Sequence, residues 1–389
     1  MTKSATAITE HVDSTTAGAD LGRQIRATFK GQSADAIVLF ASARHDYSKL
    51  LAALGEASGT QIIVGSSSAG EFTHLSRGEG YASALGLRAG GGMRFAAAVG
   101  RDLAADPRAA ARRVVESFEG MGARALPYRY ALVMTDALAG YTDAVVEELT
   151  IATGGNYGFF GGGAGDDGRF QETHVFCGRE SFTNAVVALE IQSEQPIGVG
   201  VSHGWVPASG GFRVTEADGM RLVSLNGAPA IVAFEEYADA TGQTLDRANP
   251  LPFFLHNILG IKNGVNHRLR VPLGVNADGS VACAAAIPSG AIVHIMKTTE
   301  ASAALAAEQA TRAALAGLTG RKPGAALVFD CVATRMRLGR AFDEELKACA
   351  TLLEPAGFVG CNTYGQIARA EGQFGGFHNC TAVVCVLPE

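Results

Sequence analysis

Short apolar runs and amphipathic segments alternate along the chain, and their order repeats three times. Continuous apolar runs predict buried strands at residues 36–40, 130–134 and 325–329. Segments with apolar residues at helical spacing follow these runs, at residues 47–57, 142–152 and 341–353. A second apolar run then enters a glycine-rich turn, and closing strands follow at residues 82–88, 184–191 and 381–387. The pattern predicts an α/β fold of repeated strand-helix-strand-strand units with mixed sheets and glycine-rich turns.

The repeat extends toward the N-terminal side of each copy. Helical spacing predicts a preceding helix at residues 21–29, 107–118 and 301–315. Strands at residues 94–99 and 291–296 come before the second and third of these helices. We therefore expect the last two copies to open with a strand and a helix.

Residues 196–288 follow a different pattern. They contain short strand-like runs, the only tryptophan, Trp205, and the dipeptide Asn226-Gly227, which is typical of a hairpin turn. We predict an N-terminal tail and helix followed by two modules, at residues 1–34, 35–240 and 241–389.

Composition and charge narrow the class of protein. The chain has 389 residues, 47% of them hydrophobic, and a net charge of −6, which excludes extensive disorder and gives no electrostatic footprint of a nucleic-acid binder. The densest basic cluster, formed by Arg335, Arg337 and Arg340, predicts a solvated surface. No apolar stretch predicts a membrane span and no signal peptide is evident, so we expect a cytoplasmic protein. The seven cysteines include no Cys-x-x-Cys pair, which argues against a disulfide framework or a structural zinc site.

The three glycine turns hold the candidate ligand-binding residues. These are Ser66, Ser67, Ser68 and Glu71 in the first turn, Asp166 in the second, and Cys361, Asn362, Thr363 and Tyr364 in the third. A turn with few Cβ atoms exposes backbone N–H groups that can bind a phosphate or a carboxylate. A tight strand-to-strand turn requires glycine equally well. Because the three turns lie at equivalent places, we expect at least one of them to line a pocket.

A hydrolase that uses the serine-rich turn or Cys361 is the enzymatic alternative. A serine nucleophile needs a general base and an oxyanion hole. The chain has no Gly-x-Ser-x-Gly motif, and no complete set of nucleophile, base and orienting group can be assembled from it. We therefore expect a binding protein and not an enzyme.

Several of these segments resemble the FIST family of sensory proteins. The likeness rests on the first glycine turn at residues 63–71, on 196–205 with its Gly-Trp, on the Leu-Asn-Gly-Ala-Pro-Ala run at 225–230, on 357–367 and on the His-Asn-Cys-Thr segment at 378–381. It covers about residues 35–389 and includes the N- and C-terminal FIST modules in order. This chain has Gln366 where the family usually has glutamate.

The resemblance implies a cytosolic small-ligand sensor that regulates a separate partner, such as a sensor histidine kinase or a cyclic-di-GMP enzyme. Some members of the family bind haem and respond to nitric oxide. We expect this activity here, with His203 and His256 as candidate ligands of the haem iron. A sensor of an amino acid or another small metabolite, held by residues of the glycine turns, is the alternative. We expect no nucleic-acid or membrane partner, and a homo-oligomer stays open.

Overall fold

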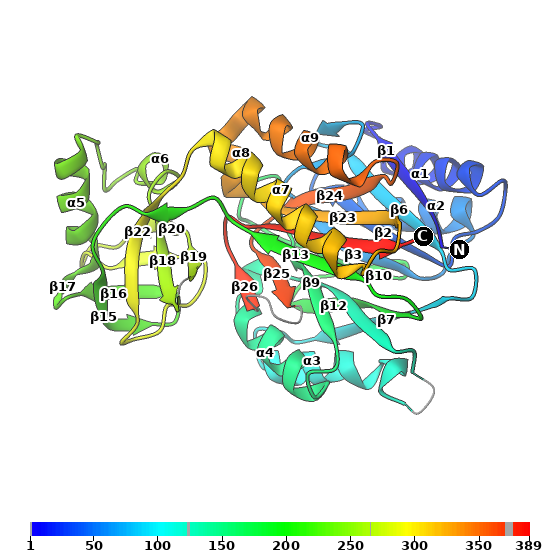
Figure 1. Cartoon of the computed structure of the whole chain (residues 1–389), viewed down its shortest axis with the longest axis horizontal. Helices are drawn as coiled ribbons and strands as arrows, with labels where there is room; N and C mark the ends of the chain where they lie inside the picture. Colours follow the sequence, from blue (N-terminus) through cyan, green and yellow to red (C-terminus); the bar gives the residue numbers. More distant parts are fainter. Residues whose placement is uncertain (1, 123–124, 265, 370–375) are drawn as a thin grey trace.

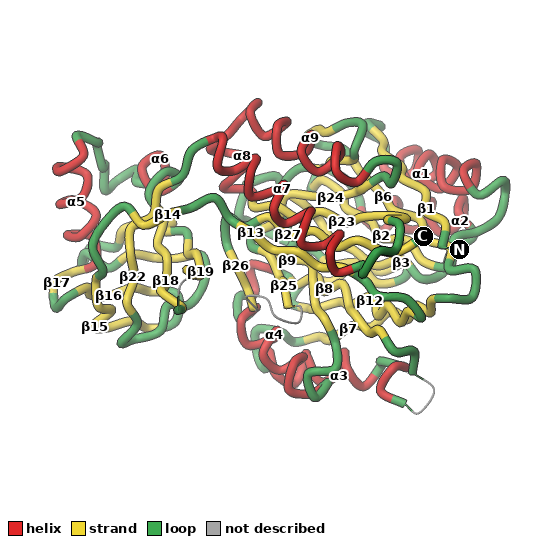
Figure 2. The backbone as a smooth tube through the Cα atoms, viewed as in Figure 1, coloured by secondary structure: helices red, strands yellow, loops and turns green. Residues whose placement is uncertain are grey.

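Four β-sheets with flanking helices form the mixed α/β fold of this computed structural model, which describes residues 2–122, 125–264, 266–369 and 376–389 (Figures 1 and 2). Three sheets of six strands form one body, which we call the core. The fourth sheet, of nine strands, forms a second body at the left of Figure 1. No helix in the described ranges is long and apolar enough to cross a membrane.

The three six-stranded sheets share a group of four strands in one order. The first sheet runs β1 (Lys3–Thr9), β6 (Ala82–Arg88), β2 (Ala36–Ser42), β3 (Ile63–Ser68). The second runs β7 (Met93–Arg101), β12 (Ala185–Ser193), β8 (Tyr128–Thr135), β9 (Gly158–Gly163), and the third runs β13 (Gly198–Ser202), β27 (Ala382–Pro388), β23 (Pro323–Cys331), β24 (Phe358–Thr363). In each group the last two strands are parallel and the other neighbours are antiparallel. We call the three groups, with their helices, units 1, 2 and 3.

Two long helices accompany each group of strands (Figure 1). They are α1 (Ser14–Thr28) and α2 (Tyr47–Ser58) in unit 1, α3 (Pro107–Glu116) and α4 (Thr142–Ala152) in unit 2, and α7 (Glu300–Gly317) and α9 (Phe342–Leu353) in unit 3. The side chains of Asp13, Asp46 and Asp106 each accept a hydrogen bond from a backbone N–H in the first turn of a helix. This bond satisfies a donor that has no partner within the helix, so these residues set where α1, α2 and α3 begin.

A short hairpin from each unit pairs with the sheet of another unit. The pairings are β4 (Glu71–Thr73) and β5 (Arg77–Gly78) of unit 1 on β24, β10 (Val175–Cys177) and β11 (Glu180–Phe182) of unit 2 on β3, and β25 (Gln366–Arg369) and β26 (Gly376–His378) of unit 3 on β9. The exchange closes a ring, because unit 1 completes unit 3, unit 3 completes unit 2 and unit 2 completes unit 1. The core therefore has an approximate threefold arrangement.

The nine-stranded sheet is inserted into unit 3, between β13 and α7. Units 1 and 2 have only a short connection at the same point, at residues 10–13 and 102–106. Its strands are β14 (Val206–Pro207), β15 (Phe212–Asp218), β16 (Arg221–Leu225), β17 (Ala228–Pro229), β18 (Ile258–Asn263), β19 (Asn266–Arg270), β20 (Pro272–Val275), β21 (Val281–Cys283) and β22 (Ile292–Lys297). Two helices, α5 (Ala230–Thr241) and α6 (Leu251–Phe254), complete this inserted domain. Short helices elsewhere are η1 (Glu119–Met121), η2 (Ala137–Ala139), α8 (Val332–Leu338) and η3 (Gly339–Ala341).

The α/β class and the threefold repeat agree with the sequence, and two details differ. Residues 3–9, expected as part of a tail, form the edge strand β1, whose buried residues are the small Ala5, Ala7 and Thr9. The prediction that residues 291–296 open the third copy is wrong. That strand is β22 of the inserted domain, and β13 opens unit 3. The division into modules at residues 35–240 and 241–389 stays a prediction.

Candidate functional site

The three glycine turns meet at the centre of the core. In each turn, one position requires glycine for the same steric reason. Gly65, Gly161 and Gly360 lie opposite their partners in the parallel strand pairs. A Cβ atom would lie 1.8 Å from the carbonyl oxygen of Leu39 at Gly65, and 2.1 Å from the corresponding oxygen at each of the other two. Close approach of two backbones therefore requires glycine at all three positions.

Backbone hydrogen bonds join every pair of turns. Units 1 and 3 are joined by Ala69 N to Asn362 O and by Asn362 N to Gly70 O, both at 2.9 Å. Between the turns themselves, two such bonds join units 1 and 2, and two join units 2 and 3, the latter including Tyr364 N to Gly163 O at 3.0 Å. The turns thus satisfy one another's backbone groups, as buried backbone requires.

Glu71 is a fully buried acid in the first turn. It accepts hydrogen bonds from the hydroxyl of Ser68 and from Tyr81 N, the second at 3.0 Å. Burial raises the pKa of Glu71 to about 8, and the hydrogen bond from Ser68 opposes this shift. Glu71 is therefore mostly protonated at neutral pH.

Asp166 organises the loop that follows the second turn. Its carboxylate accepts hydrogen bonds from the backbone N–H groups of Phe170, Gln171 and Glu172 at 2.6–3.0 Å, and from the hydroxyl of Tyr364. Burial alone would raise the pKa of Asp166, but the bonds from Tyr364 and the backbone outweigh it and lower the pKa. Asp166 thus holds a loop of unit 2 against a tyrosine of unit 3.

The other residues predicted for this site are buried in the same place. Ser67 exchanges hydrogen bonds with the backbone of His174, and Thr363 donates to Asp330 O. The Ser66 hydroxyl and the Asn362 amide nitrogen have no hydrogen-bond partner among the described residues. Cys361 is buried, which raises its pKa well above the usual range. The structure therefore brings all nine predicted ligand-binding residues together, and of these Tyr364 lines a cleft.

That cleft, which we call the interdomain cleft, lies between the core and the inserted domain. Its volume is about 390 Å³, within the range of small-molecule sites. The inserted domain contributes Leu251, Leu255, Val271, Leu273 and Ala284, and the core contributes Leu138, Phe170, Cys331, Val332, Ala333, Met336, Tyr364 and Asn379. None of these lining residues is charged. Leu138, Phe170, Leu273 and Met336 are each 39–44% exposed, so the cleft concentrates apolar surface that water contacts.

One wall of the cleft is an aromatic pair. Phe170 stacks on Tyr364 with ring centroids 4.4 Å apart and planes 14° from parallel. Phe170 has a φ of 54°, a left-handed conformation that is unfavourable for a bulky side chain. The hydrogen bonds of Asp166 to this loop hold the ring in place despite that cost. Strain maintained by surrounding structure is common at ligand sites.

The predicted iron ligands do not fit the interdomain cleft. The Nδ1 atom of His203 accepts from Trp205 N at 3.4 Å, and its Nε2 atom donates to His267 O at 3.0 Å, so both ring nitrogens are engaged. Burial lowers the pKa of His203, against the hydrogen bonds to its ring. His256 is exposed and is not a lining residue. The lining also offers no cation to pair with the two carboxylates of a haem.

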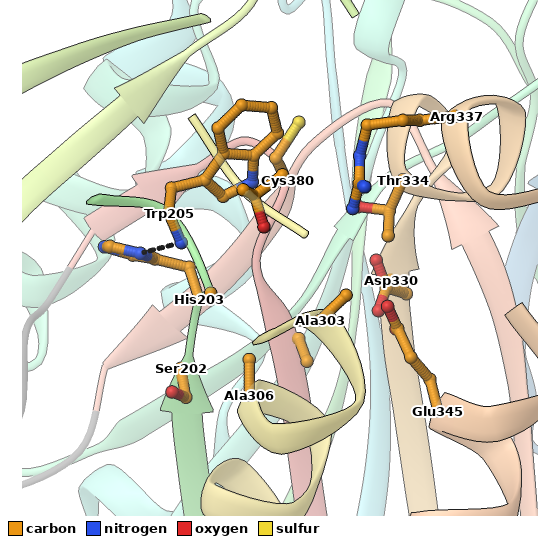
Figure 3. Close-up of a pocket in the computed structure, with 13 residues that line it drawn as sticks. Ser202, His203, Trp205, Ala303, Ala306, Asp330, Thr334, Arg337, Glu345 and Cys380 are labelled. Atoms are coloured by element: carbon orange, nitrogen blue, oxygen red, sulfur yellow. Dashed lines mark hydrogen bonds between the residues drawn. The ribbon is translucent and has the colours of Figure 1, made fainter. Parts of the chain in front are cut away.

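A small polar cavity adjoins the cleft, and the predicted iron ligand His203 is among its lining residues (Figure 3). The cavity also holds two acids, Asp330 and Glu345, that the sequence did not single out. Asp330 and Glu345 face each other there, hydrogen-bonded and buried, and burial raises the pKa of both. Arg337 lies over the ring of Trp205, 5.5 Å from its centroid. Asp330 could have been found from the sequence, because it is an acid that directly follows the buried run at residues 325–329.

The arginine cluster is only partly at the surface. Arg335 has a side chain 13% exposed and pairs with Glu79, and Arg337 is half-buried, whereas Arg340 is exposed. The prediction of a solvated surface is therefore wrong for the first two, because α8 turns them toward the core and the cavity. Within the described ranges, no group of three or more His, Cys, Asp or Glu side chains is arranged to hold a metal ion.

Comparison with known proteins identifies the family to which this chain belongs. The model of the FIST N domain matches residues 35–228, and that of the FIST C domain matches residues 233–369. No curated protein matches the chain. Two Thermotoga maritima structures, PurLQS and PurL complexed with ATP, are 13% and 14% identical to it. Each covers all of this chain, which spans 72% and 71% of theirs, with TM-scores of 0.25 and 0.23, so they bear on neither fold nor function.

Proposed function

We propose that this chain, which belongs to the FIST family, is a sensor that binds a small uncharged apolar ligand in the interdomain cleft. FIST domains are associated with signal transduction and small-ligand sensing. The observation that carries the proposal is the uncharged, apolar lining of a 390 Å³ cleft between two bodies of the protein. Burying apolar surface contributes about 25 cal/mol per Å² to binding such a ligand.

The position of the cleft suggests how binding becomes a signal. A ligand there contacts both the core and the inserted domain, and it favours one orientation of the two bodies. Beside the cleft, the buried Arg270 of the inserted domain ties the two together. Its guanidinium donates to Phe377 O at 3.1 Å and to both carboxylate oxygens of Asp143 at 3.1–3.2 Å. Because the ion pair between Arg270 and Asp143 is either formed or broken, we expect the two bodies to switch between two distinct orientations.

The proposed output is regulation of a separate partner, a sensor histidine kinase or a cyclic-di-GMP enzyme. We propose a binding role and not catalysis. The Ser68 hydroxyl is directed to Glu71, and among the described residues no histidine ring nitrogen is hydrogen-bonded to Ser66, Ser67 or Ser68. Glu71 is mostly protonated at neutral pH and is therefore a poor base, and a serine without a base is a weak nucleophile. The expected signature is a partner activity that changes only when ligand-loaded protein is added.

The lone tryptophan offers a direct test with an uncharged apolar dye, Nile red. Trp205 packs in one cluster with Val271, Cys331 and Ala333, and these three residues line the cleft. We expect Nile red to bind with one site per chain and to quench Trp205 fluorescence. Leu273→Lys, which places a charge in the cleft, should weaken binding at least about tenfold.

Leu305→Lys is the matched control, since Leu305 is 50% exposed on α7 and is not a lining residue. Equal binding by both variants and by the wild type would reject the interdomain cleft as the site. Haem binding stays a prediction, and an absorbance spectrum of protein mixed with haem tests it. A Soret band that persists in His203→Ala and His256→Ala would assign the iron to other ligands.

A further inference from the structure

Two cysteines that are 49 residues apart in sequence meet at the base of the interdomain cleft. Cys331 ends β23 and lines the cleft, and Cys380 lines the adjoining polar cavity just before β27. β23 and β27 are antiparallel neighbours with Phe329 opposite Val383, so both cysteines lie at the same end of these strands. They pack in one cluster with Trp205.

The two thiols have different environments. The two thiols lie close enough to affect each other's pKa, and the backbone N–H groups of Cys380 and Ala333 lie near the Cys331 sulfur. The hydrogen bond from Cys380 is the largest cause that lowers the pKa of Cys331, against burial and the nearby Asp330 carboxyl. The same hydrogen bond, together with burial, raises the pKa of Cys380, while Arg337 opposes this.

The other five cysteines lack this arrangement. They are Cys177, Cys283, Cys349, Cys361 and Cys385, and burial raises the pKa of each. Among the seven, Cys331 is therefore the one whose pKa is lowered, and it packs in one cluster with a second thiol. A nucleophilic thiolate beside a resolving thiol is the arrangement of redox-active cysteine pairs.

We propose that Cys331 and Cys380 are a redox site, at which an organic hydroperoxide that enters the interdomain cleft is reduced and the two cysteines form a disulfide. The site uses the same cleft as the proposed function but requires no resident ligand. An apolar cleft favours a hydroperoxide with an apolar organic group, because that group leaves water on entering.

The chemistry balances in two steps. The Cys331 thiolate attacks the terminal oxygen of the hydroperoxide, an S–O bond forms, the O–O bond breaks, and the alkoxide takes a proton to become an alcohol. The Cys380 sulfur then attacks the Cys331 sulfenic acid, an S–S bond forms, and hydroxide leaves and is protonated to water. The pair loses two electrons and the peroxide gains them, so two thiols and one hydroperoxide give a disulfide, an alcohol and water.

The test treats reduced full-length protein with one equivalent of cumene hydroperoxide. The number of free thiols titrated in denaturant should fall from seven to five per chain. Mass spectrometry of an unreduced digest should find Cys331 linked to Cys380, and fragmentation must separate Cys380 from Cys385, which shares its tryptic peptide. Cumene hydroperoxide should react faster than hydrogen peroxide. Equal rates would contradict the proposal that the apolar cleft favours an organic hydroperoxide.

Three variants make the test specific. In Cys380→Ser the Cys331 sulfenic acid should accumulate and be trapped by dimedone, whereas Cys331→Ser should form neither adduct nor disulfide. Cys177→Ser is the matched control, because Cys177 is half-buried and more accessible than either partner, and it should still form the disulfide. Seven intact thiols in treated wild type, or oxidation of Cys177 with Cys331 and Cys380 still reduced, would overturn the proposal. Nile red binding by Cys331→Ser shows whether the cleft itself is intact, so the two proposals fail separately.

Discussion

The glycine turns and the interdomain cleft meet at Tyr364, yet they are built in opposite ways. At the turns, polar groups such as Glu71 and Asp166 are buried and bonded to neighbours in the protein. In the cleft, apolar side chains such as Phe170 and Met336 are exposed to water. The Ser66 hydroxyl and the Asn362 amide nitrogen have no partner among the described residues, but hydrogen-bonding capacity that is already used cannot bind a ligand, whereas uncovered apolar surface can. The turns therefore hold the three units together, and the cleft is the better site for a ligand.

The largest expected effect breaks the turns. In Gly161→Ala the new Cβ would overlap the carbonyl oxygen of Val133, and the φ of 136° at this position is also unfavourable for alanine. Since backbone must move, we expect a loss of at least about 3 kcal/mol of unfolding free energy, measured by urea denaturation. Gly65→Ala and Gly360→Ala should lose similar amounts.

Gly210→Ala is the control for this series, because a Cβ there meets nothing within 4 Å. If Gly161→Ala unfolds at the same urea concentration as Gly210→Ala, the turns are not as tightly packed as the threefold arrangement requires.

The next effect links the two regions. Asp166→Ala removes the acceptor of three backbone N–H groups and of the Tyr364 hydroxyl. The Tyr364 hydroxyl is buried and would lose its acceptor, and the loop would lose three hydrogen bonds to a charged group, so we expect a loss of about 2–3 kcal/mol in unfolding free energy. The loop with Phe170 would no longer be held, and Nile red binding should weaken in the same variant. Asp218→Ala, an exposed acid on β15, should change neither quantity.

The sequence predicted the repeated elements well and the assembly poorly, for a physical reason. Periodicity is local, so α4 at Thr142–Ala152 and β6 at Ala82–Arg88 begin and end where predicted. The exchanged hairpins escape such analysis, since β4 and β25 have three and four residues and their partners are distant in sequence. The repeat alone was enough to predict that the turn residues come together, because it places the three turns at equivalent positions.

The cleft could not be predicted in this way. Its walls come from segments as distant as Leu138 and Asn379, and each contributes single apolar residues that have no pattern of their own. Cys331 and Asp330 lie at the end of a run that was correctly predicted as a strand. Their roles depend on Cys380 and Glu345, which only the fold brings near.

A smaller effect concerns the acid buried at the turns. Because the folded pKa of Glu71 is raised to about 8, the folded protein keeps a proton that the unfolded chain releases above its ordinary pKa of 4.5. Stability from this residue is therefore full below pH 4.5 and is lost as pH rises to about 8. The side chain in Glu71→Gln is neutral at every pH, so the melting temperature of this variant should depend less on pH between pH 5 and 8. The substitution should also stabilise the protein by about 1 kcal/mol or more at pH 8. The same slope in Glu71→Gln and in the exposed-site control Glu216→Gln would show that Glu71 is ionised in the folded protein.

The smallest effect on stability should be the most informative about the cleft. Phe170 and Tyr141 are both exposed aromatic residues with positive φ, 54° and 63°, but only Phe170 lines the cleft. Phe170→Gly relieves about 1 kcal/mol of left-handed strain and gives up a stacked pair of about the same value, so the unfolding free energy should change by less than about 0.5 kcal/mol. Nile red affinity should nevertheless fall about tenfold, because one wall of the cleft is lost, while Tyr141→Gly should bind the dye as the wild type does. Equal affinities in the two glycine variants would mean that exposed aromatic surface as such, and not the cleft, takes up apolar molecules.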